Sequence, residues 1–354
     1  MSGTSRSPSS SKARPGFTLI ELLVVMIIIG LLVSLVLPAI QKVREAARRS
    51  NCGANMHQIG LAVANYESTH GFFPPSWKPT PAEANGRING WSVWALMLPY
   101  LEQNNAYSHL NFDQGYSNAP IVTAADGSSI KINALRVPSY LCPSEVRDEA
   151  KLDKSGVPSD YPNNYAVNLG TWFVYNPTTG EGGPGAFYPN SRLRAADFRD
   201  GMSGTLCASE VKAWQPNVGS AGLAGPLAIP AVPPDVTGLG GTFNATSGHT
   251  EWADGRCVHA GFTTTFKPNA VVPYVDAASG TTYDIDWVNQ REGISATAIT
   301  WAALTTRSYH DGVVNTAMMD GSVRTFANDI DLGVWRAFST RNGGELIPSK
   351  YQGQ

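Results

Sequence analysis

The sequence predicts an α+β fold in which a long amino-terminal helix precedes a loop-rich head built mainly on antiparallel β-sheet. Three observations support this prediction. Residues 17–37 form one apolar run of helical length. Only 15% of the 354 residues are charged, whereas 35 are glycine and 24 are proline, a composition that favours strands joined by turns. Near the carboxyl end, two strand-like runs flank an Asp-Gly pair, which is a strong β-hairpin signal.

The apolar run of residues 17–37 is the first element. At about 1.5 Å per residue, a helix of this length can cross a hydrocarbon core roughly 30 Å thick. A short stretch with Arg6, Lys12 and Arg14 and no acid precedes it. A secretory signal peptide and an uncleaved signal anchor are the alternatives, but the run is long for a signal peptide and no A-x-A-like site follows it. Its single charge, Glu21, costs on the order of 2.5–3.5 kcal/mol in hydrocarbon, so we expect it to be functional.

Residues 38–71 continue the helical pattern. Apolar residues at Ile40, Val43 and Ala47 and an alanine-rich composition favour helix, and Gly71 is a plausible stop. We expect a kink near Pro38. The first half of the helix should lie in the membrane, and the second half should pack against the head.

The head contains further predicted elements. We expect a helix at 90–107, strands at 137–145, 163–170 and 203–211, an extended loop at 218–248, and a turn at Asp254-Gly255 with a short β segment beside it. A hairpin at 313–328 turns at Asp320-Gly321, and a capped terminal helix follows, stopped by Gly343 or Gly344.

The segment GFTLIELLVV, together with its basic leader, resembles the processing site of type IV prepilins and type II secretion pseudopilins. The resemblance implies cleavage between Gly16 and Phe17 by a prepilin peptidase on the cytoplasmic side, and N-methylation of Phe17. Glu21 would then pair with the amine of Phe17 in a neighbouring subunit and would act in assembly, because a buried carboxylate needs a partner.

The orientation of the chain follows from this resemblance rather than from charge counting. Lys42, Arg44, Arg48 and Arg49 make the far flank of the apolar run at least as basic as the leader. The motif places the amino terminus in the cytoplasm, which implies a single-pass protein of the inner membrane. Its head would be exported to the periplasm or cell surface. The implied partners are the prepilin peptidase, other pilin-like subunits and the lipid bilayer.

Residues 17–344 resemble a second family. YESTHGFFPP, WSVWALMLPYLEQ, YLCPSE, WADGRCVHAGFTTTFKPN and an H-x9-DG signature formed by His310, Asp320 and Gly321 are similar to the DUF1559 family of large pilin-like proteins, which are abundant in planctomycete bacteria. Glu145 stands where some relatives carry Asp. The two resemblances imply a leader at 1–16, a transmembrane helix at 17–37, a helical spine at 38–71 and an α+β head at 72–354, with the signature region at about 310–344.

His310 and Asp320 are the candidate chemical residues. They could form a divalent-metal or acid/base site, or they could be structural, with Asp320 serving the turn; we favour the structural role. GxSxG, HExxH and P-loop motifs are absent from the sequence, so we predict no enzyme, no catalytic residues, no metal and no cofactor. Asp284 and Asp286 lack a calcium-loop pattern and should lie in a solvated loop.

Cysteines and tryptophans give weaker predictions. Cys52, Cys142, Cys207 and Cys257 form no CxxC pair, which argues against a zinc site. We expect at least one disulfide in the exported body, with Cys142, Cys207 and Cys257 as candidates and the pairing open. Six scattered tryptophans should pack in the core rather than form a sugar-stacking surface: Trp91, Trp94, Trp172, Trp252, Trp287 and Trp301.

The overall prediction is an exported pilin-like structural subunit. Its formal net charge of -2 and the lack of a basic stripe argue against a nucleic-acid partner. A surface-tethered protein that binds a solute or a polysaccharide is the alternative, with a glycan as its ligand. A metal-dependent enzyme centred on His310 and Asp320 is the third reading.

Overall fold

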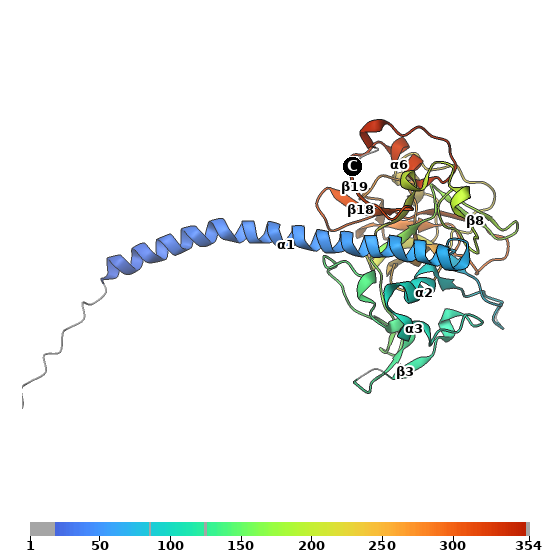
Figure 1. The fold of residues 1–354 in the computed structure, drawn as a ribbon, viewed down its shortest axis with the longest axis horizontal. Helices are drawn as coiled ribbons and strands as arrows, with labels where there is room; N and C mark the ends of the chain where they lie inside the picture. Colours follow the sequence, from blue (N-terminus) through green and yellow to red (C-terminus); the bar gives the residue numbers. More distant parts are fainter. Residues whose placement is uncertain (1–17, 85, 124–125, 352–354) are drawn as a thin grey trace, which may run out of the picture. The chain divides into compact units, whose positions relative to one another are not determined.

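The computed structural model describes residues 18–84, 86–123 and 126–351 and has the predicted α+β fold (Figure 1). It divides into two compact units, Met1–Ala47 and Arg48–Gln354. Helix α1, Leu19–His70, contributes its first part to one unit and its last part to the other. The second unit also holds all of the sheets and the helices α2 to α6.

Helix α1 is one 52-residue element that continues through Pro38. It ends where the sequence predicts. Gly71 has a left-handed φ of +76°, which glycine adopts without steric cost, and its N–H donates to the carbonyl of Glu67 at 2.7 Å. This hydrogen bond satisfies one of the carbonyls that every helix leaves open at its carboxyl end.

The last part of α1 buries one face in the head. Cys52, Met56, Ile59, Val63 and Tyr66 recur at alternating steps of four and three residues, which places them on one stripe of the helix. Most of them belong to the main core cluster, together with residues of the segment that follows Trp91 and of the five-stranded sheet. By contrast, Ile40, Val43 and Ala47 are exposed; they lie in the first unit.

The five-stranded sheet is the centre of the head. Its strand order is β13-β7-β10-β18-β19, and only the β13–β7 pair is parallel. Alternate residues of its strands face two different clusters, as the pleat requires. Tyr165 and Val167 lie in the cluster that contains α1, whereas Ala166 lies in the cluster that contains the terminal helix α6. The strands are β13 (Gly261–Phe262), β7 (Tyr165–Asn168), β10 (Leu206–Glu210), β18 (Val313–Met318) and β19 (Val323–Ala327).

A six-stranded sheet forms the second layer of strands. Residues of this sheet form a separate hydrophobic cluster, in which the rings of Trp172 and Trp287 stack with centroids 5.4 Å apart. Only β11 and β16 pair in parallel. In order, its strands are β12 (Thr242–Gly248), β11 (Gln215–Gly219), β16 (Asp286–Val288), β17 (Thr300–Ala303), β8 (Phe173–Asn176) and β9 (Glu181–Gly182).

Short elements complete the head. Two-stranded ribbons pair β1 (Trp77–Lys78) with β2 (Trp91–Ser92), β3 (Ile121–Thr123) with β4 (Ser129–Lys131), β5 (Lys151–Leu152) with β6 (Pro158–Asp160), and β14 (Pro273–Val275) with β15 (Thr282–Asp284). The short helices are α2 (Val93–Met97), α3 (Asn104–Tyr107), α4 (Pro234–Thr237) and α5 (Cys257–Ala260).

Several predicted elements are confirmed. Strands β7 and β10 lie within the segments 163–170 and 203–211, and the hairpin of β18 and β19 turns at Asp320-Gly321. Helix α6, Leu332–Ser339, is capped by Asp331, whose side chain accepts from the N–H of Val334. It ends at Ser339, with Thr340 as its C-cap, a few residues before the glycines expected to stop it.

Three other predicted elements are wrong. The expected helix at 90–107 is broken into α2, a 3₁₀ turn at Leu98–Leu101 and α3, because Pro99 and the left-handed Glu102 interrupt it. The expected strand at 137–145 contains a 3₁₀ turn, Pro138–Tyr140. The expected loop at 218–248 contains β12, which gains its hydrogen bonds from β11.

Candidate functional site

The amino-terminal motif is the first candidate site. Gly16 and Phe17 lie outside the described residues. Thr18 and Glu21 form a reciprocal cap at the start of α1: Glu21 Oε2 accepts from the backbone N–H and the hydroxyl of Thr18 at 2.9 and 2.8 Å, and Thr18 Oγ1 accepts from the N–H of Glu21 at 3.3 Å. The carboxylate of Glu21 therefore has a partner within its own chain.

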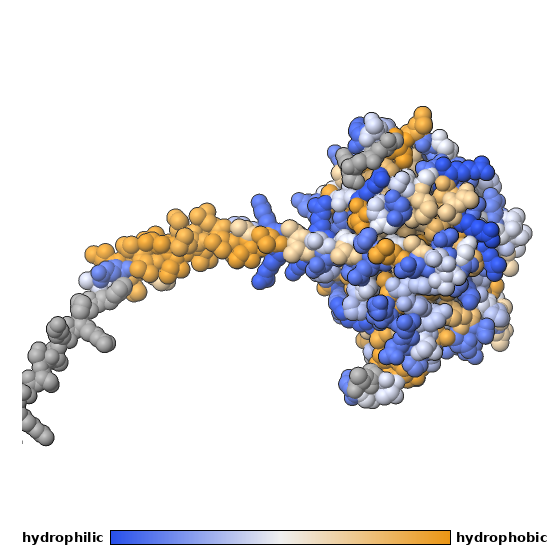
Figure 2. Space-filling model, in the orientation of Figure 1, coloured by the Kyte–Doolittle hydropathy of each residue, from blue (hydrophilic) through white to orange (hydrophobic). Residues whose placement is uncertain are grey.

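The helix behind this motif exposes an apolar surface. Every residue from Leu19 to Leu37 is exposed, and the large aliphatic side chains among them remain between 44% and 79% accessible. Figure 2 shows the apolar side chains covering this part of α1 on the visible side. By length and composition, α1 can cross a membrane. Such a surface needs lipid or the apolar side of another helix.

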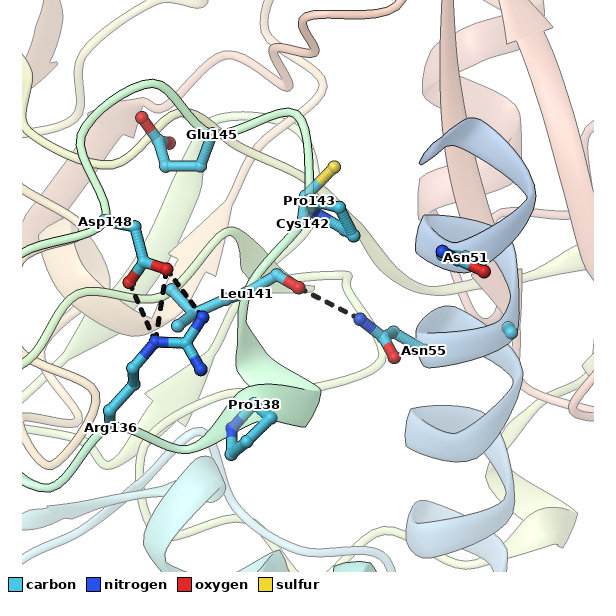
Figure 3. A pocket seen from close by; sticks show the side chains of 10 residues that line it. Asn51, Asn55, Arg136, Pro138, Leu141, Cys142, Pro143, Glu145 and Asp148 are labelled. Atoms are coloured by element: carbon cyan, nitrogen blue, oxygen red, sulfur yellow. Dashed lines mark hydrogen bonds and ion pairs between the residues drawn. The ribbon is translucent and has the colours of Figure 1, made fainter. Parts of the chain in front are cut away.

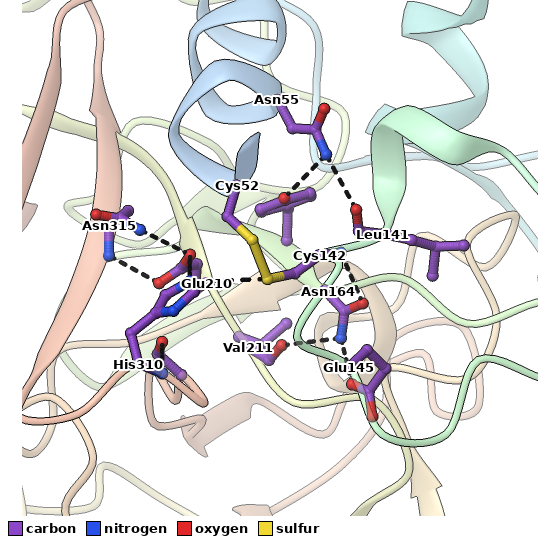
Figure 4. Close-up of a disulfide and its surroundings, with 12 residues drawn as sticks. Cys52, Asn55, Leu141, Cys142, Glu145, Asn164, Glu210, Val211, His310 and Asn315 are labelled. Atoms are coloured by element: carbon purple, nitrogen blue, oxygen red, sulfur yellow. Dashed lines mark hydrogen bonds and ion pairs between the residues drawn. A yellow bond between two sulfur atoms is a disulfide. The ribbon is translucent and has the colours of Figure 1, made fainter. Parts of the chain in front are cut away.

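A disulfide ties α1 to the head within the second unit. It joins Cys52 of the helix to Cys142, which follows the 3₁₀ turn at Pro138–Tyr140 (Figure 4). Cys207 and Cys257 are buried free thiols, so the expectation that they are disulfide candidates is wrong. The partner of Cys142 is Cys52, which is not among the three candidates and lies in α1.

Beside the disulfide lies a buried His–Glu pair. His310 Nε2 is 3.2 Å from Glu210 Oε1 and 3.8 Å from the sulfur of Cys142. Asn315 donates to Glu210 twice, from its backbone N–H at 2.8 Å and from its side chain at 3.0 Å. Figure 4 shows these residues converging on the disulfide from β10, β18 and the segment before β18. His310 thus packs against the disulfide of α1.

Asp320 and Gly321 form the turn at the other end of β18. Asp320 is exposed, and its Oδ1 accepts from the N–H and the hydroxyl of Ser322. Gly321 has a φ of +83°. Its carbonyl oxygen lies 3.0 Å from His57 Nδ1, and its Cα would lie only 3.0 Å from a Cβ added at Gly60. The turn therefore rests directly on the buried face of α1.

The residues of the H-x9-DG signature therefore contact α1 at two separate places and do not come together in one site. His310 and Asp320 flank β18, a six-residue strand that is about 20 Å long, so they cannot ligate one ion. His310 meets the helix through the disulfide, and Gly321 meets it through His57 and Gly60. Sequence reasoning missed His57 and Gly60, although a glycine inside a helix is a recognised sign of close packing.

A groove runs between α1 and the segment around Cys142 (Figure 3). Its volume is about 380 Å³. Asn51 and Asn55 line it from the helix, and Arg136 and Asp148 form an ion pair at its opposite wall, at 2.5 Å. Cys142 also lines the groove and is 7% exposed. The disulfide therefore borders this groove through Cys142, while both cysteines are buried.

Two buried ionic networks lie elsewhere in the head, and in each of them carboxylates pair with cationic side chains. Lys151 pairs with Glu251, and Arg256 pairs with Asp254 at 2.6 Å. Burial would raise the pKa of Glu251, but His259 and Lys151 outweigh it and hold the pKa at about 2. Burial lowers the pKa of the nearby His259 to about 4.

The second network corrects the expectation of a solvated loop at Asp284 and Asp286. Asp286 is fully buried at the start of β16. Arg307 pairs with Asp286 at 2.5 Å and with Asp284 at 2.9 Å. Burial would raise the pKa of Asp286, yet the guanidinium of Arg307 keeps it below its ordinary value. Arg307 therefore links β15, which contains Asp284, to β16, which contains Asp286.

The six tryptophans considered for sugar stacking lie mainly in the core, as predicted. Five of them are no more than 3% exposed: Trp91, Trp94, Trp172, Trp252 and Trp287. Trp301 is half-buried against Phe173 and Trp172. Buried rings cannot stack on a sugar in solvent, so the five buried tryptophans do not form a glycan surface.

Comparison with known proteins agrees with both resemblances. The model of a family described as a protein of unknown function (DUF1559) matches residues 41–333. The model of the prokaryotic N-terminal methylation motif matches residues 11–37, which include Gly16, Phe17 and Glu21. No curated protein and no solved structure matches the chain.

Proposed function

Because the chain belongs to the DUF1559 family and carries a prokaryotic N-terminal methylation motif, we propose that it is a pilin-like structural subunit that assembles through α1. The motif and the apolar helix behind it indicate a membrane-anchored protein with an exported head. The observation that carries the proposal is the position of this motif, directly before a helix whose aliphatic side chains are exposed. Lipid covers such a helix in a dispersed subunit, and neighbouring helices cover part of it in an assembly.

Processing follows from the motif. A prepilin peptidase cleaves between Gly16 and Phe17, and the new amine of Phe17 is methylated. The leader then comprises residues 1–16, the membrane span 17–37, the spine 38–71 and the head 72–354. The chain crosses the inner membrane once, with its amino terminus in the cytoplasm and its head in the periplasm or at the cell surface.

Glu21 is the assembly residue in this proposal. Both contacts from Thr18 use Oε2, so Oε1 can accept a hydrogen bond from the methylated amine of Phe17 in a neighbouring subunit. Methylation keeps the positive charge of the amine. A carboxylate and an ammonium group in a low-dielectric environment attract strongly, and they also fix the axial register of the two helices.

Two substitutions separate the charge of Glu21 from its role as a helix cap. Glu21→Gln keeps an acceptor for Thr18 but removes the charge, whereas Thr18→Ala keeps the charge but removes the hydroxyl contacts of the cap. We expect crosslinked ladders of subunits in native membranes from the unsubstituted chain and from Thr18→Ala. Glu21→Gln should give monomers, although it should remain in the membrane after alkaline extraction.

The comparison of Glu21→Gln with Thr18→Ala tests the proposed pairing of Glu21 with the amine of Phe17. Normal ladders from Glu21→Gln would show that the charge is not used in assembly. Monomers from the unsubstituted chain at every crosslinker length would show that the protein is a dispersed anchor and not an assembling subunit.

A further inference from the structure

We propose that Cys52, Cys142, Glu210 and His310 form a binding site for Zn²⁺, or a similar thiophilic divalent cation, when the two cysteines are in the dithiol form. The site is independent of subunit assembly. It would hold the last part of α1 on the head before the disulfide forms, or whenever it is reduced.

The geometry brings four ligand atoms together. One oxygen or nitrogen atom from each of Glu210 and His310 and the two sulfur atoms all lie within 4.8 Å of one another. Donor atoms that bind Zn²⁺ tetrahedrally at about 2.0–2.3 Å lie roughly 3.3–3.8 Å apart. His310 Nε2 is 3.8 Å from the sulfur of Cys142 and 3.2 Å from Glu210 Oε1. Small movements of side chains would therefore complete the coordination.

The ligand types and charges also suit this ion. Thiolate, imidazole and carboxylate are the groups that bind Zn²⁺ in proteins. Two thiolates and the carboxylate of Glu210 carry three negative charges, which the ion reduces to one. Asn315 orients the carboxylate through two neutral hydrogen bonds, as the groups behind metal ligands commonly do.

The other cluster of potential ligands in the described part of the chain differs in charge. Glu251, Asp254 and His259 also lie within 4.8 Å of one another. Lys151 and Arg256 already neutralise its two carboxylates. A divalent cation would have to displace these two side chains, whereas the Cys52–Cys142 cluster offers a net negative charge once it is reduced.

The groove shown in Figure 3 borders the proposed site at Cys142. Cys142 lines that groove and is 7% exposed, and Cys52, Glu210 and His310 are buried. The groove carries one cation, Arg136, which is paired with Asp148, and its other lining residues are uncharged or acidic.

The chemical states of the site are mutually exclusive. The chain is synthesised with thiols, and binding exchanges two thiol protons for one Zn²⁺ ion. Disulfide formation instead removes two protons and two electrons, which requires an oxidant, and it leaves no thiolate to bind the metal. The same two cysteines therefore hold α1 either through a covalent bond or through the ion.

Titration with Co²⁺ tests the proposal on the full chain in detergent, under a phosphine reductant and without oxygen. We expect one equivalent to bind, with the thiolate-to-cobalt charge-transfer absorption of a tetrahedral site, and Zn²⁺ should displace it. The oxidised chain should not bind. His310→Gln and Glu210→Gln should each weaken binding at least about tenfold, whereas Cys207→Ala and Cys257→Ala should bind as the unsubstituted chain does.

X-ray absorption of the zinc-loaded, unsubstituted chain gives a test that does not depend on the folding of variants. Two sulfur and two nitrogen or oxygen neighbours would support the site. No stoichiometric binding by the reduced chain, a different set of neighbours, or loss of binding in Cys207→Ala or Cys257→Ala would overturn it.

Discussion

At the scale of single residues, the docking of α1 depends on two glycines that face each other, Gly60 in the helix and Gly321 in the turn between β18 and β19. A Cβ at Gly60 would lie 3.0 Å from the Cα of Gly321, which is backbone and cannot rotate away. Gly321 itself has a φ of +83°, where other residues are strained. The Asp-Gly pair thus serves both the hairpin and the helix contact.

This contact can be tested with a matched pair of substitutions in α1. Gly53→Ala adds a Cβ that meets nothing within 4 Å, so the better helix propensity of alanine should stabilise the chain by up to ~1 kcal/mol. Gly60→Ala has the same propensity gain but meets Gly321, and we expect it to be at least ~1 kcal/mol less stable than Gly53→Ala. Thermal unfolding in detergent measures the difference. Equal stabilities would show that the turn does not pack closely on the helix.

Glu292 is a buried carboxyl whose ionisation opposes folding. Burial raises its pKa from 4.5 to about 7, and its Oε2 accepts from the N–H of Cys257 at 3.0 Å. Between these two pKa values the folded chain binds the proton more tightly than the unfolded chain. The stability that the folded chain gains from binding this proton on Glu292 is therefore fully present below pH 4.5 and is lost as the pH rises towards 7.

We expect Glu292→Gln to remove this dependence, because an amide keeps an acceptor for Cys257 and cannot ionise. The gain in stability of the variant over the unsubstituted chain should grow with pH to about 3 kcal/mol near neutrality. Denaturant unfolding at a series of pH values measures it, with the exposed Glu181→Gln as control. A difference that does not change with pH would contradict the raised pKa of Glu292.

At the scale of elements, the disulfide is a covalent cross-link between α1 and the rest of the head. It closes a loop with a sequence separation of 90 residues, which in the chain-entropy model corresponds to about 3–5 kcal/mol. The free thiols do not provide an alternative pairing in the folded state. Burial raises the pKa of Cys207 to about 12 and that of Cys257 well above its ordinary value, so neither forms a thiolate readily.

Removal of the disulfide should lower the free energy of unfolding by about 3–5 kcal/mol. The double variant Cys52→Ala and Cys142→Ala and the reduced, chelator-treated chain should both unfold at clearly lower denaturant concentrations than the oxidised chain. Cys207→Ala, which keeps the disulfide, serves as the control and should change much less. An unfolding midpoint that reduction does not shift would show that packing alone holds α1 in place.

Elements with a local chemical cause could be predicted from the sequence. The stop of α1 at Gly71, the turn at Asp320-Gly321 and the Asp331 cap each depend on residues within a few positions. The errors depend on distant contacts. Strand β12 exists because β11 pairs with it, and the chain at 137–145 is shaped by its disulfide to α1 and by Asn164, which accepts from the N–H of Cys142 at 3.1 Å.

At the scale of the whole molecule, the architecture of the head follows from a sheet with two covered faces. Helix α1 and the residues that pack with it cover one face of the five-stranded sheet, and α6 covers the other. Family membership and the long apolar helix could be predicted because their motifs are contiguous. The cluster around the disulfide could not, because Cys52, Cys142, Glu210 and His310 come from segments far apart in the sequence and converge only in the fold.

Processing at the amino-terminal motif can be measured from the mass of the amino-terminal peptide of the mature chain, purified from native membranes. We expect a peptide that begins at Phe17 and carries one methyl group on its amine, because cleavage after Gly16 creates the charged partner of Glu21. A mature chain that still begins within residues 1–16, or that begins beyond Glu21, would contradict the assignment as a processed pilin-like subunit.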